Sequence, residues 1–179
     1  DSDMYFELAT IIAGMGDVHT SIKAPESLYE RIFPFDTRYF GDRLCIVDYV
    51  EGYEELAPYL LREIVAVNGV DIAYLMRKAE SITDPTNNWH SMETFSYNWS
   101  PIPAFYEWAS GCDTWETCTL QILNENQEVE SVEIPVISWE EYESSKKVFA
   151  ESLMSIPLMF KEDQAGYIDW SGGCAYLSI

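Results

Sequence analysis

The segment Leu61–Ile82, LREIVAVNGVDIAYLMRKAESI, decides the fold. It opens with an apolar run rich in β-branched residues, Ile64 to Val67, which predicts a short strand. Asn68-Gly69 follows, and because both residue types tolerate positive φ, the pair predicts a reversal of the chain. Asp71 is placed to cap a helix. The helix would bury one apolar face, made by Ile72, Leu75, Met76 and Ala79.

Further strands are predicted on both sides of this segment. Leu44–Val50, LCIVDYV, follows a turn at residues 40–43, and its continuous apolar residues indicate burial on both faces. Residues 117–124 and 128–137 alternate apolar and polar side chains around Glu125-Asn126-Gln127, which predicts a hairpin. Residues 165–179 predict a second hairpin with a Gly-Gly turn. The fold class expected is therefore α+β.

The remaining segments predict helices and one long loop. Met4, Leu8, Ile11 and Ile12 recur at helical spacing and predict a largely buried helix that ends at Gly14 or Gly16. Pro103 suits the first turn of a helix over residues 102–109. Ser138 is expected to cap a short charged helix. Residues 83–100 are rich in Asn, Pro, Thr and Trp and predict a loop with a turn at Asp84-Pro85.

The charge balance restricts the partners. The 179-residue chain has 10 Lys and Arg against 31 Asp and Glu, a formal net charge of -21. Such a chain would be repelled by nucleic acid and by anionic membrane surfaces. No stretch is long and apolar enough to span a membrane, so membrane insertion is not expected. The acidity suits an exported protein, and we expect an extracellular or bacterial cell-envelope location.

The residues that usually carry chemistry are sparse. The four cysteines, Cys45, Cys112, Cys118 and Cys174, form no CxxC pair, and with only two histidines neither a metal site nor a cofactor is expected. Cys45 suits a buried position, whereas Cys112 and Cys118 are close enough in sequence for one disulfide. No GxSxG motif occurs, so we assign no catalytic residue.

The segment Asp17-Val18-His19-Thr20 leaves two interpretations open. If it is extended, Asp17 and His19 share one face and the carboxylate can orient the imidazole, as a small hydrolase would require. Alternatively, these side chains form a turn network that ties the first helix to the next segment, which we favour because no nucleophile lies nearby in sequence.

Three pieces of the chain, taken together, resemble the tail-specific or C-terminal processing serine peptidases related to the tricorn core. Asp17-Val18-His19-Thr20 resembles the family's Asp-Gly-His-Thr signature, with Val18 in place of Gly. Residues 40–46 followed by 63–72 are similar to the PDZ-like domain, with Ile64, Val67, Asn68 and Gly69 as the matching positions and Arg62-Glu63 as the departure. The passage from Ile156-Pro157-Leu158 to Ile179 is similar to the entry into the protease domain.

The resemblance implies an organisation in four parts. Residues 1–30 would form a helical cap, 31–138 a PDZ-like domain, 139–160 a linker helix and 161–179 the start of a truncated, protease-like domain. In this family the catalytic serine and lysine would follow residue 179, so the chain alone is not expected to be an enzyme. Its partners would then be the rest of the same polypeptide and a peptide or unfolded protein C-terminus.

The resemblance also implies a peptide site, because PDZ-like folds add an extended peptide to a sheet edge beside a helix. The turn Phe40, Gly41, Asp42 and Arg43 would meet the peptide carboxylate. Leu44, Cys45 and Ile46 would pair with the peptide, and Ile72, Leu75 and Ala79 would line the groove. Alternatively, these residues are simply core. A different class of function, an extracellular adhesion or carbohydrate-binding module, is suggested by the Trp-rich residues 83–115.

Overall fold

The computed structural model describes residues 2–17, 19–83, 88–111, 116–148, 166–169 and 175–178. They belong to two units, Asp1–Val148 and Phe149–Ile179. The first unit combines helices with antiparallel sheets, so the predicted α+β class is confirmed. In the second unit, β9 (Gly166–Asp169) pairs antiparallel with β10 (Ala175–Ser178), as the predicted terminal hairpin requires. The predicted Gly172-Gly173 turn lies outside the described residues.

The segment Leu61–Ile82 folds as its sequence predicts. β4 (Ile64–Val67) is followed by β5 (Val70–Asp71), and α2 (Ile72–Ile82) begins at once. Asn68 and Gly69 reverse the chain with φ values of 48° and 76°. The Asp71 side chain accepts a hydrogen bond from the Tyr74 N–H at 3.0 Å and so caps α2.

A four-stranded antiparallel sheet is built on β4. Its strand order is β5-β4-β6-β7, with β6 (Thr117–Leu123) and β7 (Val129–Pro135) forming the predicted hairpin. The alternation along β6 buries Cys118, Leu120 and Ile122 completely. Because side chains on a strand alternate between faces, this pattern turns one side of β6 toward the core.

A second hairpin consists of β2 (Phe35–Phe40) and β3 (Arg43–Tyr49). Leu44, Cys45 and Ile46 are all buried, which confirms that β3 is covered on both faces. A smaller pair joins β1 (Arg31–Ile32) to β8 (Ile137–Ser138). Next comes α5 (Trp139–Ser144), whose Glu141 N–H donates to the Ser138 hydroxyl at 3.1 Å, the expected cap. Two short 3-10 helices complete this part of the chain: η1 (Glu26–Tyr29) precedes β1, and η2 (Glu54–Tyr59) follows β3.

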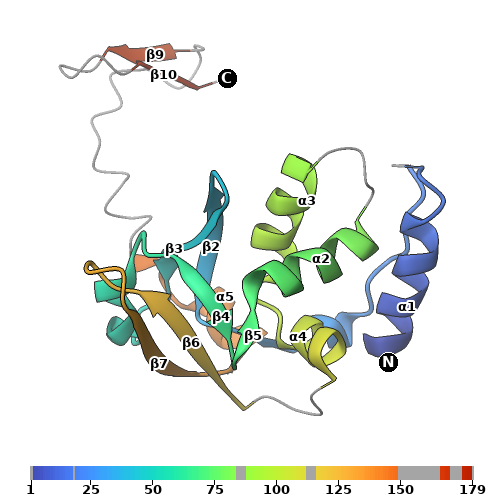
Figure 1. The fold of residues 1–179 in the computed structure, drawn as a ribbon, viewed down its shortest axis with the longest axis horizontal. Helices are drawn as coiled ribbons and strands as arrows, with labels where there is room; N and C mark the ends of the chain where they lie inside the picture. The colour runs from blue at the N-terminus through green and yellow to red at the C-terminus, as the bar shows by residue number, and fades with distance from the viewer. Residues whose placement is uncertain are drawn as a thin grey trace. The chain divides into compact units, whose positions relative to one another are not determined.

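The core of the first unit is aromatic on its helical side. α4 (Pro103–Ser110) begins with the predicted Pro103 and carries Phe105 into a cluster with Phe6 of α1 (Ser2–Ala13). Figure 1 shows α1, α2, α3 (Asn88–Thr94) and α4 gathered on one side of the strands. Phe105 also meets Phe95, Trp99 and Trp108 at ring-centroid distances of 5.6, 6.3 and 5.9 Å.

The predicted loop over residues 83–100 is wrong. From residue 88 on, this segment forms α3 (Asn88–Thr94) and the π-helix η3 (Phe95–Trp99), while the predicted Asp84-Pro85 turn lies outside the described residues. Phe95 is fully buried and Trp99 is 7% exposed. Their contacts with α1 and α4 stabilise a helical conformation that the local composition of Asn, Thr and Ser does not favour.

The predicted burial of α1 is also corrected. Met4, Leu8 and Ile11 are 60%, 39% and 63% exposed, whereas Tyr5, Phe6 and Ala9 are buried. The helix turns its aromatic face inward because Phe6 packs against Trp99 and stacks on Trp108. Gly16 follows the helix with a φ of 68°, as the predicted left-handed ending requires.

Asn68 supplies a test of the turn that organises this segment. Its side-chain oxygen accepts from the Thr119 N–H at 2.6 Å, which ties the turn to β6. We expect Asn68→Ala to lower the free energy of unfolding by about 2–3 kcal/mol, from left-handed strain and the unpaired N–H. Asn68→Gly removes only the hydrogen bond and should cost about 1 kcal/mol. Urea denaturation of both variants measures the difference; equal losses would contradict the strain argument.

Candidate peptide-binding groove

Asp17, His19 and Thr20 form an exposed turn. The Thr20 hydroxyl and the His19 backbone N–H both donate to the Asp17 carboxylate, at 2.7 and 3.0 Å, and the Thr20 N–H donates to the Asp17 carbonyl. The hydrogen bond from Thr20, followed by that from His19, lowers the pKa of Asp17. The His19 side chain is 90% exposed. The segment is therefore a turn stabilised by the Asp17 carboxylate, and it is not extended. Within this turn the His19 Nδ1 lies 3.4 Å from the same carboxylate.

The predicted peptide-pairing strand is partly occupied by the protein itself. The Ile46 N–H donates to the Arg62 carbonyl at 3.4 Å, and the Ile46 carbonyl accepts from the Leu61 N–H at 2.8 Å. Cys45 forms an antiparallel bridge with Glu63. Covering an edge strand in this way prevents another chain from pairing with it. The predicted pairing of a peptide with residues 44–46 is therefore corrected at Ile46.

Of the three helix residues predicted to line a peptide groove, only Ile72 borders a cavity. Leu75 and Ala79 are both 0% exposed and belong to the hydrophobic core, so the prediction that they line a groove is corrected. Ile72, at 8% exposed, reaches a cavity at the start of α2. On the turn, Gly41 has a φ of 67° and Phe40 is 49% exposed. The turn thus presents its side chains to solvent.

A cavity of about 370 Å³ lies beside α2 and contains three of the predicted residues, Asp42, Leu44 and Ile72. We call it the α2 groove. Its floor is apolar, because Leu44 and Ile64 are only 1% and 2% exposed. Its full lining is Tyr39, Asp42, Leu44, Glu63, Ile64, Val65, Asp71, Ile72, Ala73, Met76, Arg77, Glu80, Asn88 and Met92.

The charges around the α2 groove are mostly negative. Four carboxylates, of Asp42, Glu63, Asp71 and Glu80, line it against the single guanidinium of Arg77. Burial, followed by the charge of Glu80, raises the pKa of Tyr39, so its hydroxyl remains protonated. Arg43, predicted to receive a peptide carboxylate, is not among the lining residues. The groove therefore favours an apolar or cationic group over a carboxylate.

Sequence reasoning missed much of this lining. Met76 belongs to the predicted apolar face of the helix, and Arg77 and Glu80 follow on the same helix. The helical period of 3.6 residues was therefore enough to predict that these three side chains lie close together. Asn88 and Met92 come from α3, a segment predicted as a loop. Ile64 and Val65 were assigned only to a strand, and a strand pattern does not indicate which end of the strand borders a cavity.

The thiols and acidic groups offer little chemistry. Cys45 and Cys118 are free and buried, and burial raises the pKa of both thiols, which makes them poor nucleophiles. Cys112, the partner that the sequence suggested for Cys118, lies outside the described residues, as does Cys174. Within the described ranges, no group of three or more His, Cys, Asp or Glu side chains could hold a metal ion. None of the helices there is long and apolar enough to cross a membrane.

No protein-family model matches the sequence, and no curated protein matches it.

Proposed function

We propose that this chain is the non-catalytic N-terminal part of a serine peptidase of the C-terminal processing type, and that it binds or gates an extended peptide substrate. The observation that carries this proposal is the α2 groove, a cavity with an apolar floor and a mostly acidic lining beside α2. Its volume lies in the range of about 300–1,000 Å³ that ligand pockets usually have. The motif resemblance suggests a peptidase, and the groove is a cavity in which a substrate side chain could bind.

The peptide would bind mainly through a side chain. Because Ile46 already uses its backbone groups within the chain, strand addition cannot extend past the start of β3. An apolar side chain would enter between Leu44, Ile64 and Ile72, which bury its surface. Met76 and Met92, on facing helices, are unbranched and adaptable, so the groove would accept apolar side chains of different shapes.

The four carboxylates that line the α2 groove, which we call its acidic rim, would select the peptide residues next to the bound apolar side chain. Carboxylates outnumber the one guanidinium in the lining, so a neighbouring Lys or Arg on the peptide is favoured and a free C-terminal carboxylate is disfavoured. The proposed substrate is therefore an internal, basic and apolar stretch of polypeptide, in place of the C-terminus that the resemblance implies.

A variant that fills the groove tests the peptide role. Ala73 is an exposed residue of α2 that lines the groove, so Ala73→Trp should fold normally and block entry. We expect titration calorimetry of the whole chain with a capped Leu- and Lys-rich peptide to show at least about tenfold weaker binding. Ser81→Trp is the matched control, since Ser81 is exposed on the same helix and does not line the groove. Equal affinity in both variants would contradict the proposal.

A charge reversal tests the selectivity. We expect Glu80→Lys to weaken binding of the basic peptide several-fold and to reduce its dependence on salt, because rim charges act through screened attraction. Glu133→Lys makes the same change in net charge on the exposed face of β7, away from the groove. If both reversals weaken binding equally, the effect comes from the net charge of -21 and the rim has no special role.

A further inference from the structure

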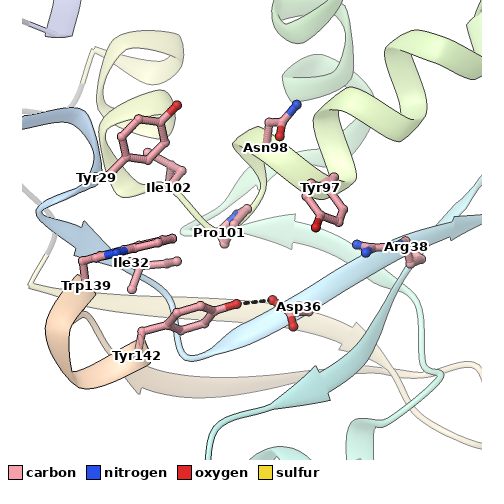
Figure 2. Close-up of a pocket in the computed structure, with 10 residues that line it drawn as sticks. All are labelled: Tyr29, Ile32, Asp36, Arg38, Tyr97, Asn98, Pro101, Ile102, Trp139 and Tyr142. Atoms are coloured by element: carbon pink, nitrogen blue, oxygen red, sulfur yellow. Dashed lines mark hydrogen bonds between the residues drawn. The ribbon is translucent and has the colours of Figure 1, made fainter. Parts of the chain in front are cut away.

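A second cavity, of about 320 Å³, lies away from the α2 groove and is walled by aromatic rings. We call it the aromatic pocket. Tyr29, Tyr97, Trp139 and Tyr142 provide the rings, and buried Ile32 and Ile102 lie beneath them. Figure 2 shows Trp139 and Tyr142 of α5 on one side of the pocket and Tyr97 of η3 on the other. Three stretches of the chain, residues 29–38, 97–102 and 139–142, therefore meet here.

The aromatic wall is held in place by its own contacts. The Trp139 ring stacks on Tyr142 with a centroid distance of 5.5 Å and an interplanar angle of 27°, and meets the edge of Tyr29 at 6.2 Å. The Tyr142 hydroxyl donates to the Asp36 carboxylate. Trp139 and Tyr97 nevertheless remain 36% and 65% exposed, so parts of both rings are available to a ligand.

The polar groups of the pocket are also positioned in advance. The Arg38 guanidinium lies 4.5 Å from the Tyr97 ring centroid and donates to the Thr37 carbonyl at 2.6 Å. It has five N–H donors, and one bond leaves donors for a ligand. Asp36 has a second partner, Lys147, at 3.0 Å. Asn98 adds an amide group to the lining of the pocket. Donors and acceptors therefore surround apolar rings.

The charges of the pocket argue against a cationic ligand. Lys147 Nζ already lies 3.5 Å from the Tyr142 ring centroid, and Arg38 already covers Tyr97. Two of the four rings therefore carry a cation, and a third positive charge would be repelled. A polyanion is disfavoured too, because Asp36 lines the pocket and the whole chain carries a net charge of -21.

We propose that the aromatic pocket binds a neutral pyranose ring of a glycan. The apolar face of such a ring, made of C–H groups, packs on Trp139, while its hydroxyls bond to Arg38, Asp36 and Asn98. A pyranose has both an apolar face and hydroxyl groups, and the pocket offers exposed aromatic rings next to side chains that donate and accept hydrogen bonds. The site is independent of the α2 groove, since the two cavities share no lining residue.

The test is an array of neutral oligosaccharides probed with the whole chain, followed by calorimetry with the glycan that binds best. We expect Trp139→Ala to weaken that binding about tenfold. Trp89→Ala is the matched control, because Trp89 is 69% exposed on α3 and does not line the pocket. Arg38→Lys keeps the charge and removes the planar fork of donors, so it should weaken glycan binding without changing Tm.

Three outcomes would overturn the proposal. The first is that no neutral glycan binds at concentrations up to about 10 mM. The second is that Trp139→Ala and Trp89→Ala weaken binding equally, which would place the glycan elsewhere. The third is that choline chloride binds and loses its affinity in Trp139→Ala, which would make the pocket a cation cage. Peptide affinity of Trp139→Ala, measured in parallel, should stay unchanged, so failure here is distinguishable from failure of the α2 groove.

Discussion

Replacing Phe105 with alanine is expected to lower the free energy of unfolding by about 3–5 kcal/mol. Phe105 is 0% exposed, and its ring meets the rings of Phe6, Phe95 and Trp99. These partners come from α1 and η3, and Trp108 of α4 also meets the ring, so the cavity left by the substitution would be lined by side chains of three elements. Aromatic side chains held this way relax poorly into a cavity, which places the loss in the upper part of the range for core substitutions.

Urea denaturation followed by far-UV circular dichroism measures this loss. Phe40→Ala is the matched control, because Phe40 is 49% exposed on the β2–β3 turn and its loss should change stability by no more than about 0.5 kcal/mol. A loss below about 1.5 kcal/mol for Phe105→Ala would mean that the helices do not share one packed aromatic core.

The second large effect is a loss of stability at alkaline pH. Tyr106 is 1% exposed, and burial raises its pKa well above the usual value of about 10. Above about pH 10 the unfolded chain ionises this tyrosine while the folded protein keeps it protonated. The stability it contributes is therefore complete below pH 10 and is lost as pH rises toward the folded pKa, by about 1.4 kcal/mol per pH unit. Burial also raises the pKa of Tyr39 and Tyr142, which steepens the decline.

Tyr106→Phe isolates one part of this decline. Near neutral pH the variant should be about 1 kcal/mol less stable, because the Tyr106 hydroxyl donates to the Ser100 carbonyl at 2.8 Å. Between about pH 10 and pH 12 its urea midpoint should fall less steeply than that of the natural protein. Tyr97→Phe is the control, since Tyr97 is 65% exposed. If the urea midpoints of Tyr106→Phe and the natural protein fall equally steeply with pH, Tyr106 does not cause the loss of stability at alkaline pH.

Local rules were sufficient wherever a residue's conformation depends on its near neighbours in sequence. The turn at Asn68-Gly69 follows from the φ values that these two residues tolerate, and the start of α2 follows from the Asp71 cap. The β6–β7 hairpin follows from the alternation of Cys118, Leu120 and Ile122. In each case the energetic preference acts between residues that are close in sequence. The conformation can therefore be predicted from the amino-acid sequence alone.

The tertiary structure decided what depends on contacts between distant segments. α3 and η3 form where composition favours a loop, because Phe95 and Trp99 find aromatic partners on α1 and α4. The edge of β3 at Ile46 is covered by Leu61 and Arg62, which closes the peptide-pairing site that the motifs implied. The aromatic pocket depends on such contacts most of all, because Trp139 of α5 and Tyr97 of η3 line it together. Hydrophobic patterns and helix or strand propensities do not predict such a contact between distant segments. The contact stabilises the fold only once both segments are packed against each other.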